Sequence, residues 1–267
     1  MSKVNYLQIK SYLRIFWQLL KTDLQIFKQA SIDETINSII TAVCTVVVFS
    51  YVFSHLGMDE HFGVFIAVGV IVSAIFWSSW TTSTVFIADL EGNRTITYFL
   101  TLPVPNYLIL IKQIVSYAIK SALTGATILP VIKLLLWNQL SFANFSLIKF
   151  VLVFALTSLF IGSLSLLITS FIKSVENLSN VSMRFLFPMW FFGGANYSWE
   201  ILYKISPKLA IITLINPLLY AMEGMRVAVL GQQGYINFWI CLPSLIGFTF
   251  LFGWWGIARL KKRLDFV

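Results

Sequence analysis

Long apolar runs separated by short polar stretches make up most of the chain. A helix needs about 20 apolar residues to cross a bilayer, and its backbone groups must be satisfied within the segment. The pattern therefore predicts an all-α polytopic membrane protein with six transmembrane helices. The predicted spans cover residues 36–56, 62–88, 108–136, 145–172, 178–194 and 237–258.

The segment 1–34 precedes the first span and is predicted to be an amphipathic interfacial helix. At about 100° per residue its basic side chains form one stripe, opposite an arc that holds Leu13, Trp17 and Leu24. Such a helix lies on the membrane with its cations toward anionic headgroups. Ser31–Glu34 has the capping-box pattern, which predicts that the next helix opens there. The basic stripe consists of Lys10, Arg14, Lys21 and Lys28.

A polar stretch at 89–107 separates the second and third spans. Gly92 and Asn93 form a turn signal, Asn93 suits an N-cap, and Pro103 stops a helix. The stretch therefore predicts a short helix of about two turns on the membrane surface. On spacing alone an ordinary loop is the alternative.

Residues 195–235 do not suit one more span. The apolar stretch 209–220 is too short to cross, and Asn216 and Pro217 interrupt it. The pattern predicts a re-entrant or interfacial pair of helices before the last span. Glu223 and Arg226 stand three positions apart and are expected to pair at the surface, where an ion pair contributes about 0–1 kcal/mol.

The composition excludes a water-soluble fold, because 58% of the 267 residues are hydrophobic and 11% are charged. The net charge of +8 does not indicate nucleic acid, since Lys and Arg gather at the termini and in loops. With six spans, both termini and the loops of Arg94 and Lys173 face the cytoplasm, as the positive-inside rule requires. We expect a multi-pass protein of the bacterial inner membrane, inserted through its first span without a cleaved signal.

A few polar side chains fall within or between the spans. Lys112 is expected to snorkel to the cytoplasmic surface, whereas Lys120 lies deeper and should face protein or water. Cys44 and Cys241 are expected to be buried structural thiols. For the histidines and acids of 55–61, a solvated turn is preferred to a metal site.

Two predicted spans carry side chains that suit a substrate path. The second span is rich in Ser and Thr, which either pack helices closely or line a polar path. The fifth is dense in aromatic rings, which either stack on sugars, contact lipid tails or only pack. The residues expected on this path are Ser78, Thr82, Phe187, Trp190 and Phe191.

The sequence lacks a GxxxxGK[ST] phosphate loop and the HExxH, GxSxG and paired-cysteine motifs. Carboxylates within spans, which many ion-coupled carriers use, are nearly missing too. We therefore expect no catalytic residue, metal or cofactor on this chain, and an energy source on another protein. A secondary carrier or channel-like protein is the alternative, with Lys120 serving a proton path. A membrane-embedded transferase is a third, without a catalytic cluster to support it.

Two segments resemble a known family. RTITYFLTLPVP at Arg94–Pro105 resembles the motif after the second span of ABC-2 permeases, the membrane half of type V ABC exporters. There a Leu-Leu-like pair, Phe99-Leu100 here, runs into a proline, Pro103. INPLLYAMEGMRVAVLG at Ile215–Gly231 resembles the late Asn-Pro, Tyr, Arg and Leu-Gly motif. The resemblance covers nearly the whole chain and identifies 1–267 as a single ABC-2 type transmembrane domain.

The resemblance implies a homodimer, or a dimer of related permeases, on two copies of a separate subunit that binds ATP and Mg. It makes 1–34 a connecting helix, 89–107 a coupling helix and 195–235 a re-entrant hairpin. The family often has an acid where Thr97 stands, so Glu91 or Arg94 is expected to substitute for it. The expected docking residues are Asp89, Glu91, Arg94, Thr97, Tyr98, Leu100 and Pro103. The expected outer-gate residues are Asn216, Pro217, Tyr220, Glu223 and Arg226.

The expected function is ATP-driven export of a lipid, a lipid-linked glycan or a hydrophobic compound. Closure of the ATPase would push on 89–103 and on the N-terminal helix. A path would then open between the first, second and fifth spans of two protomers.

Overall fold

The computed structural model describes residues 2–57, 59–92, 95–102, 104–141 and 143–264. In these ranges the elements are helices joined by turns, with no strand among them, which confirms the all-α class. Asn93, Arg94 and Pro103, which were expected to shape the coupling helix, lie outside the described residues.

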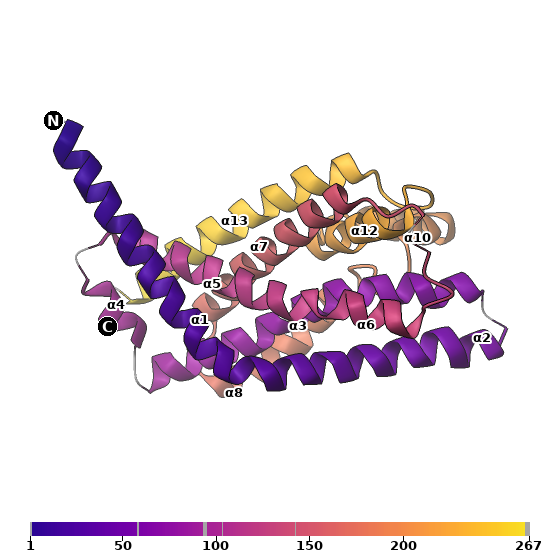
Figure 1. Ribbon diagram of the computed structural model, residues 1–267. Coiled ribbons are helices and arrows are strands. Elements are labelled where there is room, and N and C mark those ends of the chain that lie inside the picture. Colours follow the sequence, from indigo (N-terminus) through magenta and orange to yellow (C-terminus); the bar gives the residue numbers. More distant parts are fainter. Residues whose placement is uncertain (1, 58, 93–94, 103, 142, 265–267) are drawn as a thin grey trace.

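A single helix, α1 (Ser2–Val47), holds the N-terminal segment and most of the first span. The predicted helix start at Ser31 is wrong, because the Ser31 hydroxyl donates to the carbonyl of Lys28 and the helix continues through it. Figure 1 shows that α1 changes direction along its length, so that its first half leaves the bundle at an angle. A π-helical turn (Val48–Val52) and the short α2 (Phe53–His55) follow.

Among the described residues, five stretches are long and apolar enough to cross a membrane, and they match the first four and the last of the predicted spans. The first is Ser31–His55, within α1 and α2. The other four are formed by α3 (Glu60–Glu91), by α5 (Asn106–Ala126) with α6 (Ile128–Leu135), by α7 (Leu147–Phe171) and by α13 (Phe238–Leu264).

The predicted fifth span is a broken helix. It consists of α8 (Val175–Val181), a π-helical turn (Ser182–Leu186) and α9 (Phe187–Phe191). Pro188 has no N–H to bond to the carbonyl four residues earlier, which accounts for a wide turn just before it. This run is shorter than the five stretches above, and the count of six spans stays a prediction.

Residues 195–235 hold three helices rather than a pair: α10 (Trp199–Ile205), α11 (Pro207–Thr213) and α12 (Pro217–Leu230). The Asn216 side chain accepts a hydrogen bond from the N–H of Leu218 and so caps α12. Almost all of α12 is buried, and it packs against α3, α7 and α13.

Two close helix approaches depend on glycine. A Cβ on Gly162 of α7 would clash with the carbonyl oxygen of Ile114 on α5. A Cβ on Gly63 of α3 would clash with Ser50 in the π-helical turn of the first span. Small residues at such contacts let helix backbones approach each other, as membrane helices commonly do.

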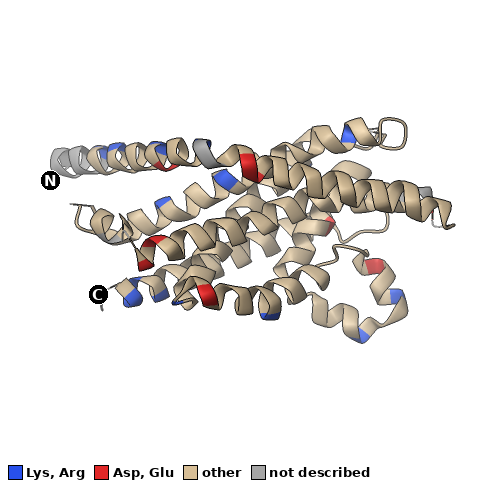
Figure 2. Ribbon diagram, turned by 90° about the horizontal axis from the view of Figure 1, so that it is seen from below, with Lys and Arg blue, Asp and Glu red and all other residues tan. Residues whose placement is uncertain are grey.

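Both termini lie at one end of the bundle, together with α4 (Thr95–Leu100), and α10 lies at the other (Figure 1). We call these the terminal end and the α10 end. Basic side chains gather at the terminal end, on α1 and the last turns of α13 (Figure 2). Arg263 donates there to the carbonyls of Thr169 and Ile172, which satisfies the C-terminus of α7.

Candidate functional site

A groove of about 1150 Å³ runs along α1 and α3. It reaches from α4 and α5 at the terminal end to Ala195 and Asn196, which follow α9. The structure places all five expected path residues on its wall, from two distant segments of the chain. These residues are Ser78, Thr82, Phe187, Trp190 and Phe191.

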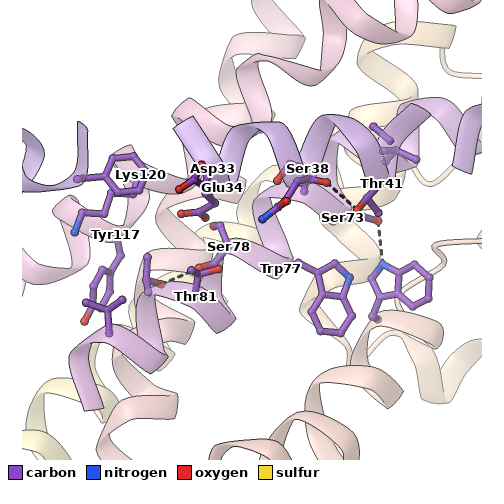
Figure 3. A pocket seen from close by; sticks show the side chains of 18 of the residues that line it. Asp33, Glu34, Ser38, Thr41, Ser73, Trp77, Ser78, Thr81, Tyr117 and Lys120 are labelled. Carbon is purple, nitrogen blue, oxygen red and sulfur yellow. Dashed lines mark hydrogen bonds between the residues drawn. The ribbon is translucent and has the colours of Figure 1, made fainter. Parts of the chain in front are cut away.

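The chemistry of the groove changes along its length. Charged side chains, Lys120 of α5 and Asp33 and Glu34 of α1, lie toward the terminal end (Figure 3). Hydroxyl groups line its middle, and aromatic rings lie both beside the charged side chains (Phe27, Phe86, Phe99 and Tyr117) and in the part nearer the α10 end. The hydroxyl-bearing residues are Ser38, Thr41, Thr45, Ser73, Ser78, Thr81 and Thr82. The aromatic residues of that part are Trp77, Phe187, Trp190 and Phe191.

The hydroxyls of Ser78 and Thr82 are satisfied within α3. Ser78 Oγ donates to the carbonyl of Ile75 at 2.8 Å, and Thr82 Oγ1 donates to that of Ser78 at 3.0 Å. Both residues are nevertheless on the groove wall. Both side chains therefore border the groove, while their hydroxyls stay bonded within α3.

Trp190 ties the broken helix to α3. Its Nε1 donates to Ser73 Oγ at 2.9 Å, and its ring lies 6.2 Å from that of Trp77. Trp77 also meets the ring of Phe187 at 4.8 Å. These contacts fix the aromatic part of the groove even though the helix that carries Phe187 and Trp190 is interrupted.

Lys112 does not reach the surface, and the expectation that it snorkels is wrong. Its side chain is 1% exposed, and Nζ lies 2.8 Å from the carboxylate of Asp23 on α1. Nζ also donates to Oε1 of Gln113 at 3.1 Å and lies 5.1 Å from the Phe99 ring centroid on α4. A counter-ion inside the protein removes the need to reach water. One ammonium group thereby contacts α1, α5 and α4.

The sequence reasoning missed Asp23, because it lies 89 residues from Lys112. One signal could have found it. At about 100° per residue Asp23 falls on the apolar arc of the N-terminal helix, opposite the basic stripe. An acid on an apolar face needs a buried partner.

The basic stripe itself is placed as expected. Lys10, Arg14, Lys21 and Lys28 are all exposed, while Leu20 and Phe27 on the opposite arc are buried. Leu13 and Trp17, on the same arc but nearer the start, are exposed. Part of the apolar face of α1 is therefore covered by neither α3 nor α5.

Asp89, near the end of α3, bonds to the start of α4, the predicted coupling helix. One carboxylate oxygen accepts from the Thr95 hydroxyl at 2.5 Å, and the other accepts from the N–H of Ile96 at 3.4 Å. Asp89 thus caps α4, the role predicted for Asn93. The predicted helix is present, and the loop alternative is wrong.

Of the other expected docking residues, Glu91 and Tyr98 are exposed. Leu100 is half-buried and packs with Ile96 in an apolar cluster at the terminal end. Thr97 lies within α4, and Arg94 and Pro103 fall outside the described residues. Glu91 and Tyr98 are therefore the docking candidates that the structure describes as exposed.

The ion pair expected at the surface is buried. Arg226 and Glu223 are both 0% exposed, with 3.6 Å between Nη1 and Oε1. Arg226 donates to the carbonyls of Ala195 and Tyr197 at 3.0 and 3.2 Å, and its guanidinium lies 3.6 Å from the Phe65 ring centroid. The pair therefore belongs to the core, and the surface value of about 0–1 kcal/mol does not apply to it.

Glu223, the acidic member of this ion pair, also accepts hydrogen bonds from the backbone. Its two oxygens accept from the N–H groups of Trp199 at 3.2 Å and Ile236 at 2.9 Å. Burial raises the pKa of the Glu223 carboxyl, while Arg226 and the two N–H groups oppose that shift. Together the two side chains hold the start of the segment that contains α10 and α11, and the loop that follows α12, against α12.

The remaining expected gate residues surround the start of α12. Asn216 Nδ2 donates to the carbonyl of Met189 at 2.6 Å, and Tyr220 donates to that of Leu214 at 2.8 Å. Pro217 occupies the first turn of the helix, where its missing N–H costs nothing. All five gate residues thus contribute to one packed structure at the α10 end.

The two cysteines differ from each other. Cys241 is buried as expected, whereas Cys44 is exposed on α1, so the expectation for Cys44 is wrong. Among the described residues no group of three or more His, Cys, Asp and Glu side chains could hold a metal ion.

Residues 14–230 match the ABC-2 type transporter family, and the chain belongs to it. This confirms the family that the two motifs indicated, and it makes the protein a membrane component of a transporter. One relative is nodulation protein J from Neorhizobium galegae. It is 26% identical over 212 residues, which cover 76% of this chain and 75% of that protein.

Proposed function

We propose that this chain is the permease subunit of an ATP-driven exporter. Two copies, or this chain and a related permease, would form the substrate path on two copies of a separate ATP-binding subunit. The observation that carries the proposal is the groove, which extends from α4 to the residues after α9. Its charged, hydroxylated and aromatic sections suit an amphiphilic substrate such as a lipid or a lipid-linked glycan.

The proposed topology has six crossings with both termini in the cytoplasm. Because both termini lie at one end, complete crossings must be even in number, and 175–191 would supply the sixth (Figure 1). The basic groups at the terminal end support a cytoplasmic placement there (Figure 2). The membrane would be the bacterial inner membrane.

The proposed coupling route starts at α4. Glu91, Tyr98 and Arg94 would meet the ATPase, and Asp89 would keep α4 attached to α3. The Lys112–Asp23 ion pair would pass the motion to α1, which forms one wall of the groove. The packed structure around Glu223 and Arg226 would act as the outer gate at the α10 end.

A coupling experiment tests the central claim. A candidate ATP-binding subunit, chosen by its phosphate loop, is co-expressed with this chain, and co-purification, ATPase activity and transport into inverted vesicles are measured. Arg94→Glu combined with Thr97→Pro should abolish substrate-stimulated hydrolysis and transport. Lys262→Gln, at the same end but on α13, is the matched control. Uphill transport by the permease alone in liposomes would instead establish a secondary carrier.

The topology is tested by labelling single cysteines. Ser2→Cys and Val267→Cys are made in a Cys44→Ser background, because Cys44 is exposed and could react by itself. In intact cells an impermeant maleimide should label neither terminus, and permeabilised cells should show labelling of both. Labelling of the C-terminal cysteine from outside would contradict six crossings.

A further inference from the structure

Charges of opposite sign face the groove near its terminal end without meeting. Lys120 of α5 lines the groove, as do Asp33 and Glu34 of α1 (Figure 3). In the part of the chain that the structure describes, none of these three side chains makes a hydrogen bond or an ion pair within 4.0 Å. Lys120 is close enough to Asp23 and to Glu34 to interact with both electrostatically.

The other charged groups of the groove wall are already occupied. Asp23 is paired with Lys112, and Asp89 accepts hydrogen bonds from Thr95 and Ile96. The carboxylates of Asp23 and Asp89 therefore stabilise helix packing at the terminal end. Only Lys120 and the two adjacent acids of α1 are left to serve a ligand among the described charged residues of the lining.

Aromatic rings from both helices hold the ammonium of Lys120 in position. Its Nζ lies 5.4 Å from the ring centroid of Phe27 on α1 and 6.0 Å from that of Tyr117 on α5. Ring faces attract a cation but leave its charge unneutralised. A lysine within a membrane-crossing stretch therefore still favours an anionic partner.

The unpaired charges of the groove lie at the depth of the lipid headgroups. Glu34 lies in the first turn of the crossing segment Ser31–His55, the level at which headgroups meet a helix. Beyond it the groove continues along α1 and α3, where hydroxyl groups and the rings of Trp77 and Trp190 line it together. A molecule that fills the groove can therefore place its charges at the level of Glu34 and extend its body along the rest.

We propose that the groove selects a membrane amphiphile whose head carries both a phosphate and a primary amine. Lys120 would bind the phosphate, and Glu34 with Asp33 would accept hydrogen bonds from the ammonium group. Such charge-assisted hydrogen bonds are stronger than those between neutral groups. The inference names the substrate class of the path proposed above and rests on that function.

The test uses the permease alone in bilayer nanodiscs made of equal parts phosphatidylethanolamine, phosphatidylcholine and phosphatidylglycerol. Native mass spectrometry then counts the lipids that stay bound after the nanodisc is removed. Wild-type protein should retain phosphatidylethanolamine preferentially. Phosphatidylcholine has the same net charge without N–H donors, and phosphatidylglycerol has the phosphate without the amine.

The variants should distinguish binding of the phosphate from binding of the amine. Lys120→Gln should weaken retention of both phosphatidylethanolamine and phosphatidylglycerol by about tenfold, the effect of losing one charged contact. Asp33→Asn with Glu34→Gln should weaken only phosphatidylethanolamine, leaving phosphatidylglycerol unchanged or stronger. Lys149→Gln and Glu200→Gln remove charges outside the groove lining and should leave the preference as in wild type.

Equal retention of the three lipids by wild-type protein would overturn the proposal. So would a preference that survives the groove variants, or one that the two control variants remove equally. Thermal denaturation of each variant shows that it remains folded. Because the ATPase is not present, the result is independent of the coupling experiment. A permease that recruits an ATPase but shows no headgroup preference keeps the proposed function and loses this inference.

Discussion

The ammonium of Lys112 and the carboxylate of Asp23 lie 2.8 Å apart in the interior of the terminal end. The pair joins α5 to the N-terminal helix, and Phe99 of α4 covers the same ammonium group. In this way the helix proposed to meet the ATPase and the helix that forms a groove wall share one buried contact. A rigid contact of this kind can transmit displacement without an additional element.

Removing one member of this pair should be costly. Lys112→Met leaves the largely buried carboxylate of Asp23 without a counter-ion, and breaking a buried pair in this way costs about 3–5 kcal/mol. The thermal denaturation midpoint of the purified permease should fall clearly. Lys204→Met, which breaks the exposed pair with Glu200, should cost about 0–1 kcal/mol. Equal stability of the two variants would show that the buried pair contributes little.

Arg226 should control the attachment of α10 and α11. In Arg226→Lys, a single ammonium group cannot reproduce the planar guanidinium that reaches two carbonyls and lies over Phe65. The segment should then open more often, and trypsin should cleave after Lys204 and Lys208 at least several-fold faster. Cleavage is followed by mass spectrometry of the protein in micelles.

Arg259→Lys is the control for this experiment, since Arg259 also lies over an aromatic ring, at 3.9 Å from that of Phe171, but near the terminal end. It should leave cleavage after Lys204 and Lys208 unchanged. A wild-type cleavage rate in Arg226→Lys would mean that packing of α12, and not the contacts of the guanidinium group, holds the segment.

Gly162 and Gly247 provide a matched pair for helix packing. Gly162→Ala places a methyl group against the Ile114 carbonyl, and overpacking of this kind typically costs about 1–3 kcal/mol. Gly247→Ala on α13 enters open space, so only the helix propensity changes, in favour of alanine by about 1 kcal/mol. The denaturation midpoints should move in opposite directions. A shift in the same direction would indicate that α5 and α7 can separate without cost.

Filling the groove should stop transport without unfolding the protein. Thr81 lines the groove and its side chain is exposed, so Thr81→Trp adds a large ring to open space. Transport by the assembled complex should fall by at least tenfold, while the denaturation midpoint stays near that of wild type. Gly247→Trp adds the same ring outside the groove lining and should transport normally. Undiminished transport by Thr81→Trp would place the path elsewhere.

Hydropathy was sufficient to predict the five crossing stretches, because lipid leaves a chain few alternatives to helices. Periodicity placed the basic stripe of α1 correctly for the same kind of reason, since it depends only on local helix geometry. The short helix at Thr95–Leu100 was predicted from its flanking turn and proline signals, and it is present.

Long-range pairing was not predictable in this way. Lys112 is buried because it pairs with Asp23, and Arg226 is buried because it reaches the carbonyls of Ala195 and Tyr197. No local pattern in the sequence specifies those contacts. Cys44 was expected to be buried because it lies in an apolar run. In a membrane helix, however, apolar residues face either protein or lipid, and hydropathy does not distinguish the two.

The π-helical turns at Val48–Val52 and Ser182–Leu186 each place one extra residue in a helix that borders the groove. An α-helix rotates by about 100° per residue, so each insertion offsets the angular phase of everything beyond it by that amount. Deleting Ser50 would therefore re-aim Phe53 and His55 around the helix axis while leaving Thr41 and Thr45 in place. Alignments of this family that treat these two segments as uninterrupted helices would assign the wrong facing to every position past the π-helical turns.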